Sequence, residues 1–516
     1  MTSTGESTAA HYDAVVVGAG SAGCLAAERL SADGSRRVLL VEAGPVPTSE
    51  SAFPPELLDA GSVRGAAPGN PYAWSFPATL TTGRPYGTVR GRILGGSSTI
   101  NGGYFIRPRA ADLDAWARLG GQQWSAAATL GPLVALEDDR DEPASAIHGK
   151  GGPIPVQRTP LDHPAAAVFR AAAADHGFAD DPDKNAEEPP GFGPVPSNVA
   201  DGVRRNAGLA FVLPALARAN LTVLGGATVD RIVTERGRAV GVQLRRGGVL
   251  ERIDAPLVVV CAGAVKTAHL LMLSGIGPAA VLSRLGIEVV ADAPRIGQAF
   301  GDHAQVVLQW QPRRPSPAPA AAWLGGALHS DGVEVLGTLT PMAALLDAAH
   351  ATDEHPLALM TSVMTPSNTG VIQVRSAHPS VAPHLNYRYL SSDDDRRRMR
   401  EAVRLSVDLL RSRAWSEASL GDSAPQGRML ADDRELDAWV HANLGTSLHT
   451  CSTVPFGGDD APVDGWGRVR GVQGLVVADT SIVPTVPTRG PAVTALLVGA
   501  VVGGALAHGL AAEATA

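Results

Sequence analysis

The stretch Tyr12-Asp13-Ala14-Val15-Val16-Val17-Gly18-Ala19-Gly20-Ser21-Ala22-Gly23 leads from an apolar run into a glycine-rich turn. A helical pattern follows at residues 25–30, and a second apolar run, Val38–Val41, ends at Glu42, 19 residues after Gly23. A strand, GxGxxG, a helix, a strand and an acidic residue in this order are typical of a dinucleotide-binding βαβ unit. Its glycines allow a tight turn, close approach to a pyrophosphate and helix–strand packing, and the acid binds a ribose hydroxyl. The sequence therefore predicts an α/β fold with a Rossmann-like domain.

A second glycine cluster lies in another part of the chain. Its sequence is Gly91-Arg92-Ile93-Leu94-Gly95-Gly96-Ser97-Ser98-Thr99-Ile100-Asn101-Gly102-Gly103. This density of glycine and small hydroxyl residues excludes a regular strand or helix. It suits a backbone loop that is pressed against a flat or anionic ligand.

With this loop the chain resembles the glucose–methanol–choline (GMC) family of flavoprotein oxidoreductases. A second family signature corresponds to Gly263–Gly277, with Ala268 in place of the usual Ser or Pro. Gly297-Gln298, Asp302-His303 and Val477–Pro484 match further family segments. The resemblance extends from about residue 10 to about residue 510, nearly the whole chain.

The resemblance implies an FAD cofactor. Family members with covalent flavin carry a His close to the position of Thr99 and Ile100, so we expect non-covalent FAD here. The residues that the motifs assign to FAD are Gly18, Gly20, Ser21, Ala22, Gly23, Glu42, Ala43, Arg92, Gly95, Gly96, Ser97, Ser98, Asn101, Gly102, Gly103, Val229, Ala262, Gly263, Ala478, Asp479 and Pro491.

The resemblance also predicts two interleaved domains, as does a length of 516 residues, which exceeds what one core usually sustains. We expect the FAD-binding domain at residues 1–155, 200–305 and 441–516. An α+β substrate-binding domain with an antiparallel sheet is expected at residues 156–199 and 306–440. Apolar runs predict strands at residues 221–224, 257–260, 371–374 and 385–387, and Ser391 or Ser392 should cap a helix that starts with three aspartates.

The catalytic base is expected near the C-terminus. Ser447–Gly457 resembles the family segment that carries the catalytic histidine, which places that role on His449. Alcohol oxidation removes a hydroxyl proton as hydride leaves the carbon for flavin N5, and a neutral imidazole can accept that proton. Cys451 has no basic partner nearby in sequence and is interpreted as a packing residue.

The second catalytic position departs from the family pattern. The family places a His or Asn directly before the proline that corresponds to Pro491, where this chain has Gly490. The neighbouring Arg489 could supply a cation that stabilises a developing alkoxide or the reduced flavin. It could equally be a structural residue or a contact for a substrate anion.

Composition excludes several other classes. The chain carries 43 Lys and Arg against 51 Asp and Glu and has no basic patch, so nucleic acid is not an expected partner. Three separated cysteines, Cys24, Cys261 and Cys451, predict neither a disulfide framework nor a metal site and favour a reducing cytosol. Residues 1–11 lack the apolar core of an export signal. The apolar segment 491–510 could span a bilayer, but Gly499, Gly503 and Gly504 favour a buried helix closely packed on the sheet.

Three interpretations of the activity remain open. The first is a dehydrogenase. Thr488–Pro491 together with Ile100–Phe105 resembles the mycofactocin-associated branch of the family, which implies reduced mycofactocin as substrate and a respiratory-chain electron acceptor. Such an enzyme would be cytoplasmic or peripheral to the inner face of the membrane. The second is an alcohol or sugar oxidase that uses oxygen, and the third is a hydroxynitrile-lyase-like protein that keeps FAD without redox use.

Overall fold

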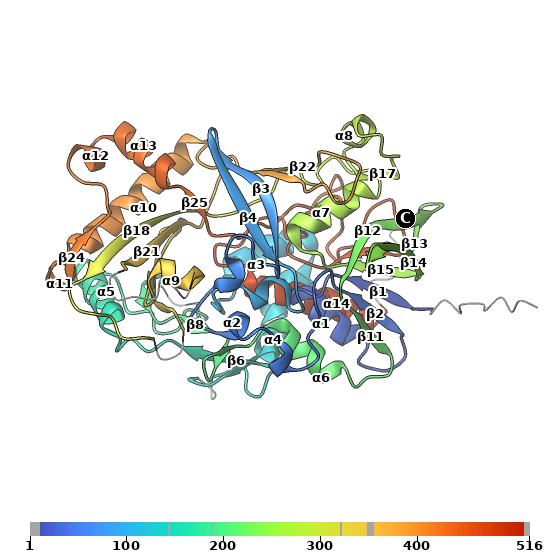
Figure 1. The fold of residues 1–516 in the computed structure, drawn as a ribbon, viewed down its shortest axis with the longest axis horizontal. Coiled ribbons are helices and arrows are strands. Elements are labelled where there is room, and N and C mark those ends of the chain that lie inside the picture. The colour runs from blue at the N-terminus through green and yellow to red at the C-terminus, as the bar shows by residue number, and fades with distance from the viewer. Residues whose placement is uncertain (1–10, 143–144, 188, 320–321, 348–354, 510–516) are drawn as a thin grey trace, which may run out of the picture.

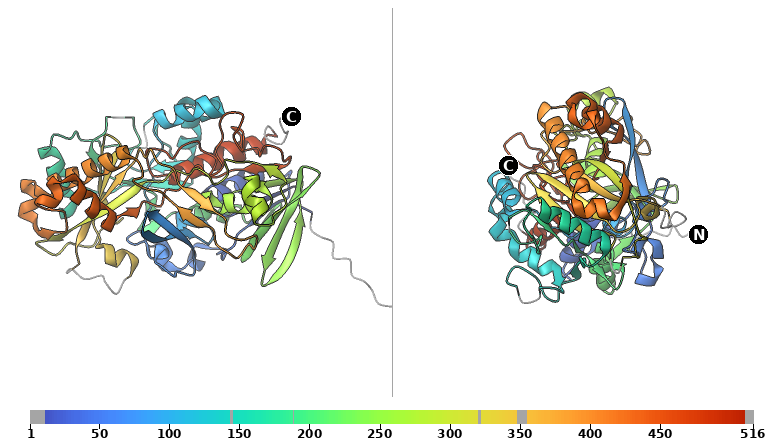
Figure 2. Two further views of the ribbon diagram at one scale, coloured as in Figure 1. Left: turned by 90° about the horizontal axis from the view of Figure 1, so that it is seen from above. Right: turned by 90° about the vertical axis from the view of Figure 1, so that its left-hand side faces the viewer.

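The computed structural model describes residues 11–142, 145–187, 189–319, 322–347 and 355–509. The first ten residues, for which no export signal is predicted, and Leu510 lie outside the described residues. Figures 1 and 2 show an elongated molecule with a parallel sheet towards one end and a large antiparallel sheet at the other. An α/β architecture with both kinds of sheet confirms the predicted fold class.

The parallel sheet has five short, buried strands in the order β11-β2-β1-β15-β26. Their bounds are β1 Ala14–Val17, β2 Val38–Val41, β11 Leu221–Leu224, β15 Leu257–Val260 and β26 Leu475–Val477. The strands predicted at residues 38–41, 221–224 and 257–260 are confirmed without a shift. Strand order reverses between β1 and β15, and ligands of open α/β sheets bind at the carboxyl ends of strands at such a switch point.

Two helices pack together beside this sheet, α1 (Ser21–Leu30) and α14 (Ala492–Ala507) (Figure 1). A Cβ atom on Gly499 would lie 2.6 Å from the carbonyl oxygen of Ala22, and one on Gly503 would lie 2.9 Å from Cα of Ala26. The glycines therefore serve helix–helix contact, and the predicted helix–sheet packing is wrong in this respect. Gly504 faces open space. Among the described residues, no helix combines the length and apolar character needed to cross a bilayer.

The antiparallel sheet has the order β24-β18-β21-β20-β19-β7, with β25 paired to β18. Its strands are β7 Phe192–Gly193, β18 Ala304–Pro312, β19 Leu324–Ser330, β20 Val333–Thr338, β21 Leu357–Val363, β24 Ser419–Asp422 and β25 Gly445–Thr446. Helix α10 (Asp393–Arg411) packs on β21, with the predicted cap: Ser392 accepts a hydrogen bond from the Asp395 N–H. Residues from four of the five predicted domain segments thus meet in one sheet.

Smaller sheets connect these parts. One has the order β22-β23-β3-β4, with β3 Ala73–Thr81, β4 Arg84–Gly91, β22 Val371–Gln373 and β23 His384–Asn386. Another, β12-β13-β14, spans Ala227–Glu235, Arg238–Arg246 and Val249–Asp254, and a third, β5-β6-β8, spans Glu137–Asp139, Ile154–Arg158 and Pro196–Ser197. Further helices are α3 Ala110–Gly120, α4 Ala126–Leu136, α5 Pro164–Asp175, α7 Gly263–Leu273, α8 Ala279–Arg284, α11 Arg413–Ala418 and α13 Asp433–Asn443. The predicted strands at 371–374 and 385–387 correspond to β22 and β23 within one residue.

Candidate active site

The GxGxxG turn links β1 to α1 and lies against the end of β15. Gly18 has φ +101°, and a Cβ there would be 2.6 Å from the carbonyl oxygen of Cys261, which only glycine permits. A Cβ on Gly23 would lie 1.9 Å from the Gly18 carbonyl oxygen. Gly20 differs from both, because no protein atom lies within 4 Å of its Cβ position. The first and third glycines are thus required by the fold, whereas the second leaves room for a ligand.

Glu42 stands at the end of β2 beside this turn. Its carboxylate accepts hydrogen bonds from the backbone N–H groups of Ala19 (3.1 Å) and Gly44 (2.8 Å). Burial raises the pKa of Glu42 to about 7, and these two hydrogen bonds oppose the rise. Each carboxylate oxygen has a further lone pair, so the group can still accept a ribose hydroxyl.

The second glycine cluster packs directly on the first. The Gly95 N–H donates to the Ala19 carbonyl oxygen at 2.8 Å, and a Cβ on Gly96 would lie 2.7 Å from Cα of Gly20. A short 3-10 turn at Gly96–Thr99 follows, in which Ser98 accepts from the Ala207 N–H. Two segments far apart in sequence thus form one continuous cradle, as their composition predicted.

The N-terminus of α7 forms the opposite wall of the cradle. Asp479, buried just after β26, accepts hydrogen bonds from the Gly263 N–H (2.9 Å) and the Thr267 hydroxyl (2.6 Å). The Cys261 thiol donates to the carbonyl oxygen of Ala478. These contacts bring the predicted residues at 262–263 and 478–479 together at the carboxyl ends of β15 and β26.

His449 is held at the edge of the antiparallel sheet, three residues after β25. Its backbone N–H and that of His303 both donate to one oxygen of buried Asp302, at 2.9 and 2.7 Å. Thr450 donates its hydroxyl to the other oxygen at 2.6 Å. One carboxylate therefore fixes the backbone on both sides of the histidine pair.

The two imidazoles meet through their Nδ1 atoms, which are 2.8 Å apart. Burial lowers the pKa of both rings well below the usual range, so both are neutral at working pH. Since a single proton lies between the two Nδ1 atoms, one ring donates and the other accepts. If His449 donates, its Nε2 carries a free lone pair and can accept a proton.

Gly490 faces that lone pair. A Cβ built on Gly490 would lie 3.5 Å from Nε2 of His449 and 3.7 Å from Cγ2 of Ile106. The position that carries the second catalytic side chain in the resembling family thus lies within van der Waals distance of the base, and Gly490 places no side chain there. Neighbouring Arg489 is 3% exposed and therefore does not point outward.

Sequence comparisons agree with this geometry. A sequence profile described as GMC oxidoreductase matches residues 12–305, and a C-terminal profile with the same description matches residues 366–499. The chain belongs to the GMC oxidoreductase family.

Full-length relatives cover nearly all of this GMC oxidoreductase. An uncharacterized GMC-type oxidoreductase of Rhodococcus erythropolis is 39% identical over 95% of this chain and 97% of its own length. An oxygen-dependent choline dehydrogenase of Vibrio vulnificus is 32% identical over 92% of this chain and 91% of its own. Among solved structures, pyridoxine 4-oxidase from Mesorbium loti superposes with a TM-score of 0.89 at 27% identity, covering 96% and 99% of the two chains.

FAD is the cofactor of this GMC oxidoreductase, as of its family. The residues present fit it, because the open space at Gly20 lies where a pyrophosphate approaches the backbone. Arg92, whose charge acts on Glu42, has a buried Nε that lacks a hydrogen-bond partner among the described residues. Its guanidinium stacks on Trp74, with the centroid 4.7 Å away, and Lys266 lies 5.2 Å from the same ring.

Other predicted cofactor residues have the following positions and contacts within their own segments. Ser97 accepts from the Gly91 N–H, and Asn101 accepts from the Gly103 N–H. Val229 lies in β12 beside an irregularity in its pairing with β13, and Pro491 immediately precedes α14. The structure therefore positions all segments assigned from sequence, while their individual contacts with FAD stay predictions.

Sequence reasoning missed how Asp302 and His303 act in the site. Both residues belong to a segment that matches the family, but the sequence alone gave them no role. Two adjacent polar residues, Asp and His, directly before an apolar strand could have indicated a functional position. Tyr389, also missed, donates its hydroxyl to the His303 carbonyl oxygen at 3.2 Å. The contact between His303 and His449 spans 146 residues and cannot be read from spacing.

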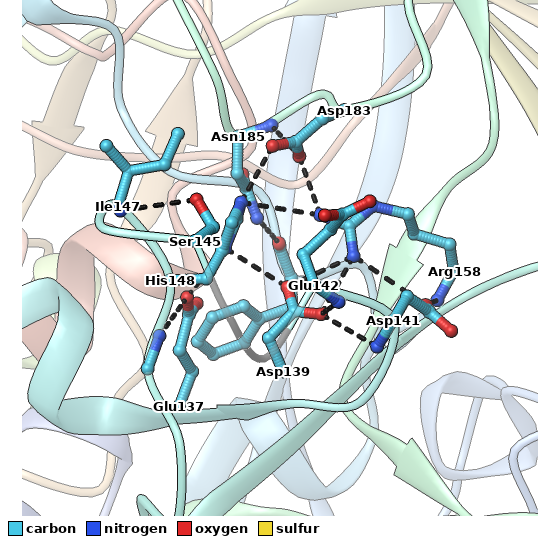
Figure 3. Close-up of polar contacts among 12 residues, drawn as sticks. Glu137, Asp139, Asp141, Glu142, Ser145, Ile147, His148, Arg158, Asp183 and Asn185 are labelled. Atoms are coloured by element: carbon cyan, nitrogen blue, oxygen red, sulfur yellow. Dashed lines mark hydrogen bonds and ion pairs between the residues drawn. The ribbon is translucent and has the colours of Figure 1, made fainter.

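A separate charged cluster around His148 has the residue types of a metal site (Figure 3). Its imidazole nitrogens lie 2.9 Å from Glu137, 3.1 Å from Asp139 and 2.7 Å from Asp183. Arg107 pairs with Glu137, and Arg158 pairs with Asp139 and Asp183. Burial alone would lower the pKa of His148, but the hydrogen bonds to Asp183 and Glu137 raise it to about 9. Asp141 is a fourth carboxylate, 3.6 Å from Arg158. All the carboxylates of the cluster thus pair with Arg107, Arg158 or His148, and a doubly donating imidazolium has no lone pair for a metal, so the cluster is a structural ion network.

Proposed function

We propose that this GMC oxidoreductase oxidises an alcohol-type CH–OH group, with His449 as the base. The observation that carries the proposal is the position of His449: its Nδ1 is engaged by His303, and its Nε2 lies beside the side-chain position that Gly490 leaves unfilled. When bound, FAD supplies the hydride acceptor at N5. A substrate hydroxyl in that space would lie within reach of Nε2, which takes its proton.

The neighbouring groups give His449 a defined proton state. The reaction needs the tautomer in which His449 donates its Nδ1 proton to His303 and leaves Nε2 unprotonated, and the 2.8 Å distance between the two Nδ1 atoms accommodates it. Burial keeps the ring neutral before the substrate binds, with a smaller contribution from the charge of Arg90. Asp302 holds the backbone of both rings and thereby their separation.

The cofactor assignment is part of the same proposal. FAD is bound non-covalently, because no histidine stands at Thr99 or Ile100, and the Thr99 hydroxyl already donates to the Leu94 carbonyl oxygen. Glu42 binds the adenosine ribose, and the cradle formed by the two glycine loops binds the pyrophosphate. The FAD-binding domain comprises residues 1–155, 200–305 and 441–516, and the rest binds substrate.

For the finer identity of the substrate we propose reduced mycofactocin, with electrons passing to a respiratory-chain acceptor at the inner face of the membrane. This rests on the resemblance of Thr488–Pro491 and Ile100–Phe105 to one branch of the family. An oxygen-using oxidase is the second candidate, favoured by the names of the relatives, an oxygen-dependent choline dehydrogenase and a pyridoxine 4-oxidase.

Anaerobic reduction of the flavin tests these proposals together. The holoenzyme is mixed with alcohols, sugars and reduced mycofactocin, and loss of the oxidised flavin absorbance is recorded before air is readmitted. Bleaching by an alcohol supports the dehydrogenase or oxidase, and rapid reoxidation with formation of hydrogen peroxide selects the oxidase. Absence of bleaching with every compound, while FAD stays bound, would contradict the proposal and favour a non-redox protein.

A further inference from the structure

Arg489 is a buried cation without a counter-charge in contact. Only 3% of the residue is exposed, and its Nη1 has no hydrogen-bond partner in the described parts of the chain. Those parts also contain no carboxylate within ion-pair distance of its guanidinium. Burying a charge without a contacting partner is strongly unfavourable, so a ligand is expected to complete the site.

Three more buried polar atoms lack hydrogen-bond partners among the described residues: the Tyr104 hydroxyl, Nε1 of Trp323 and Nδ1 of His329. Tyr104 and Trp323 belong to one apolar cluster, and the Trp323 ring abuts Gly102 of the second glycine loop. The charge of Arg489 acts on both Tyr104 and His329. Unpaired polar atoms thus converge from the cofactor loop, from β19 and from the segment beside the base.

The carboxylates of this region already have partners. Glu334 of β20 accepts a hydrogen bond from Nε2 of His329 at 2.9 Å, across the β19–β20 pair. Asp181 pairs with Lys184 at 2.6 Å, and Lys184 also donates to the Gly191 carbonyl oxygen. The charges of Arg489 and Glu334 act on each other only beyond ion-pair distance. Within the described chain, Arg489 is therefore the cation of this cluster that no carboxylate contacts directly.

We propose that Arg489, Tyr104 and Trp323 form an anion subsite, and that the alcohol substrate carries a carboxylate in addition to its reacting CH–OH group. The inference rests on the proposed function, since it assigns the anion to the substrate of that reaction. Arg489 adjoins Gly490, whose Cβ position is 3.5 Å from Nε2 of His449. A planar guanidinium binds a carboxylate through two parallel hydrogen bonds, and the Tyr104 hydroxyl and Trp323 N–H supply further donors.

The subsite also predicts which substrates are rejected. A quaternary ammonium alcohol such as choline would face the charge of Arg489, since Lys184 and Asp181 neutralise each other and Glu334 accepts a hydrogen bond from His329. Like-charge contact in a buried site disfavours binding. The family relatives named choline dehydrogenases therefore differ from this chain in the charge of the substrate that we expect.

Equilibrium binding of unreactive probes tests the subsite without turnover. Butanoate and its neutral isostere butanamide are titrated into the holoenzyme, and the shift of the flavin absorption spectrum gives each Kd. We expect butanoate to bind at least about 10-fold more tightly than butanamide, because a hydrogen bond to a charged group contributes about 1.5–3 kcal/mol. Arg489→Leu should abolish that preference, and Tyr104→Phe should weaken butanoate binding by about 2–10-fold.

Arg109→Leu is the matched control, because Arg109 is already paired with Glu187 at 3.3 Å. This variant should leave the preference for butanoate over butanamide unchanged. Unchanged butanoate affinity in both Arg489→Leu and Tyr104→Phe would overturn the proposal. The proposal would also be overturned if these variants changed only the FAD content or the spectrum of the free holoenzyme. That result would assign Arg489 to cofactor binding. If no alcohol reduces the flavin but butanoate preference depends on Arg489, the proposed function fails while the anion subsite stands.

Discussion

The contact between α14 and α1 makes a pair of glycine substitutions informative. In Gly499→Ala the new Cβ would lie 2.6 Å from the Ala22 carbonyl oxygen, whereas in Gly504→Ala it meets no atom within 4 Å. Alanine in a helix interior is favoured over glycine by about 0.5–1 kcal/mol in both variants. Overpacking against a backbone atom costs about 1–3 kcal/mol, and only Gly499→Ala incurs it. The difference between the two variants cancels helix propensity and isolates the contact.

Urea unfolding of the apoprotein gives the free energies of unfolding. We expect Gly504→Ala to be as stable as wild type or up to about 1 kcal/mol more stable, and Gly499→Ala to be about 1–3 kcal/mol less stable than Gly504→Ala. Ala22 lies in the first turn of α1, inside the GxGxxG motif, so Gly499→Ala should also weaken FAD binding. Equal stability and equal FAD affinity of the two variants would show that α14 does not lie on α1 as described.

Four further outcomes follow from the site. His449→Ala should lower the rate of flavin reduction by about 10²–10⁴-fold while FAD stays bound, because a positioned base contributes that much; a loss below fivefold would assign the base elsewhere. Arg489→Lys should lose much of the turnover and Arg489→Ala about 10²-fold, with unchanged FAD content, because lysine lacks the planar fork; wild-type rates in both would remove Arg489 from the site. His148 has its pKa raised to about 9 in the folded protein, so it should contribute stability that is complete below about pH 6.5 and is lost as pH rises through 9. In urea unfolding at a series of pH values, His148→Gln should lack this decline. An identical pH profile of the free energy of unfolding in wild type and variant would contradict the ion network. Acid denaturation should release yellow flavin into the supernatant, and flavin retained by the precipitate would refute non-covalent binding.

Local pattern was sufficient for the elements that build the cofactor cradle. β1, α1 and β2 form because apolar runs alternate with a glycine turn, and each of these signals lies within a few residues. The helix cap at Ser392 was predictable for the same reason, since it depends on one side chain and the first turn. The candidate base His449 came from a motif that is contiguous in sequence.

Only the tertiary structure decided the contacts between segments that are distant in sequence. The pairing of His303 with His449, the packing of Gly96 on Gly20 and the helix–helix role of Gly499 each join residues more than 70 positions apart. Arg489 was also a candidate from the sequence, but its burial and its unpartnered Nη1 among the described residues depend on the fold. Hydrophobic periodicity is a local property, whereas the partner of a buried polar group is set by how sheets and helices pack, and so the chemistry of the substrate side emerges only in the folded chain.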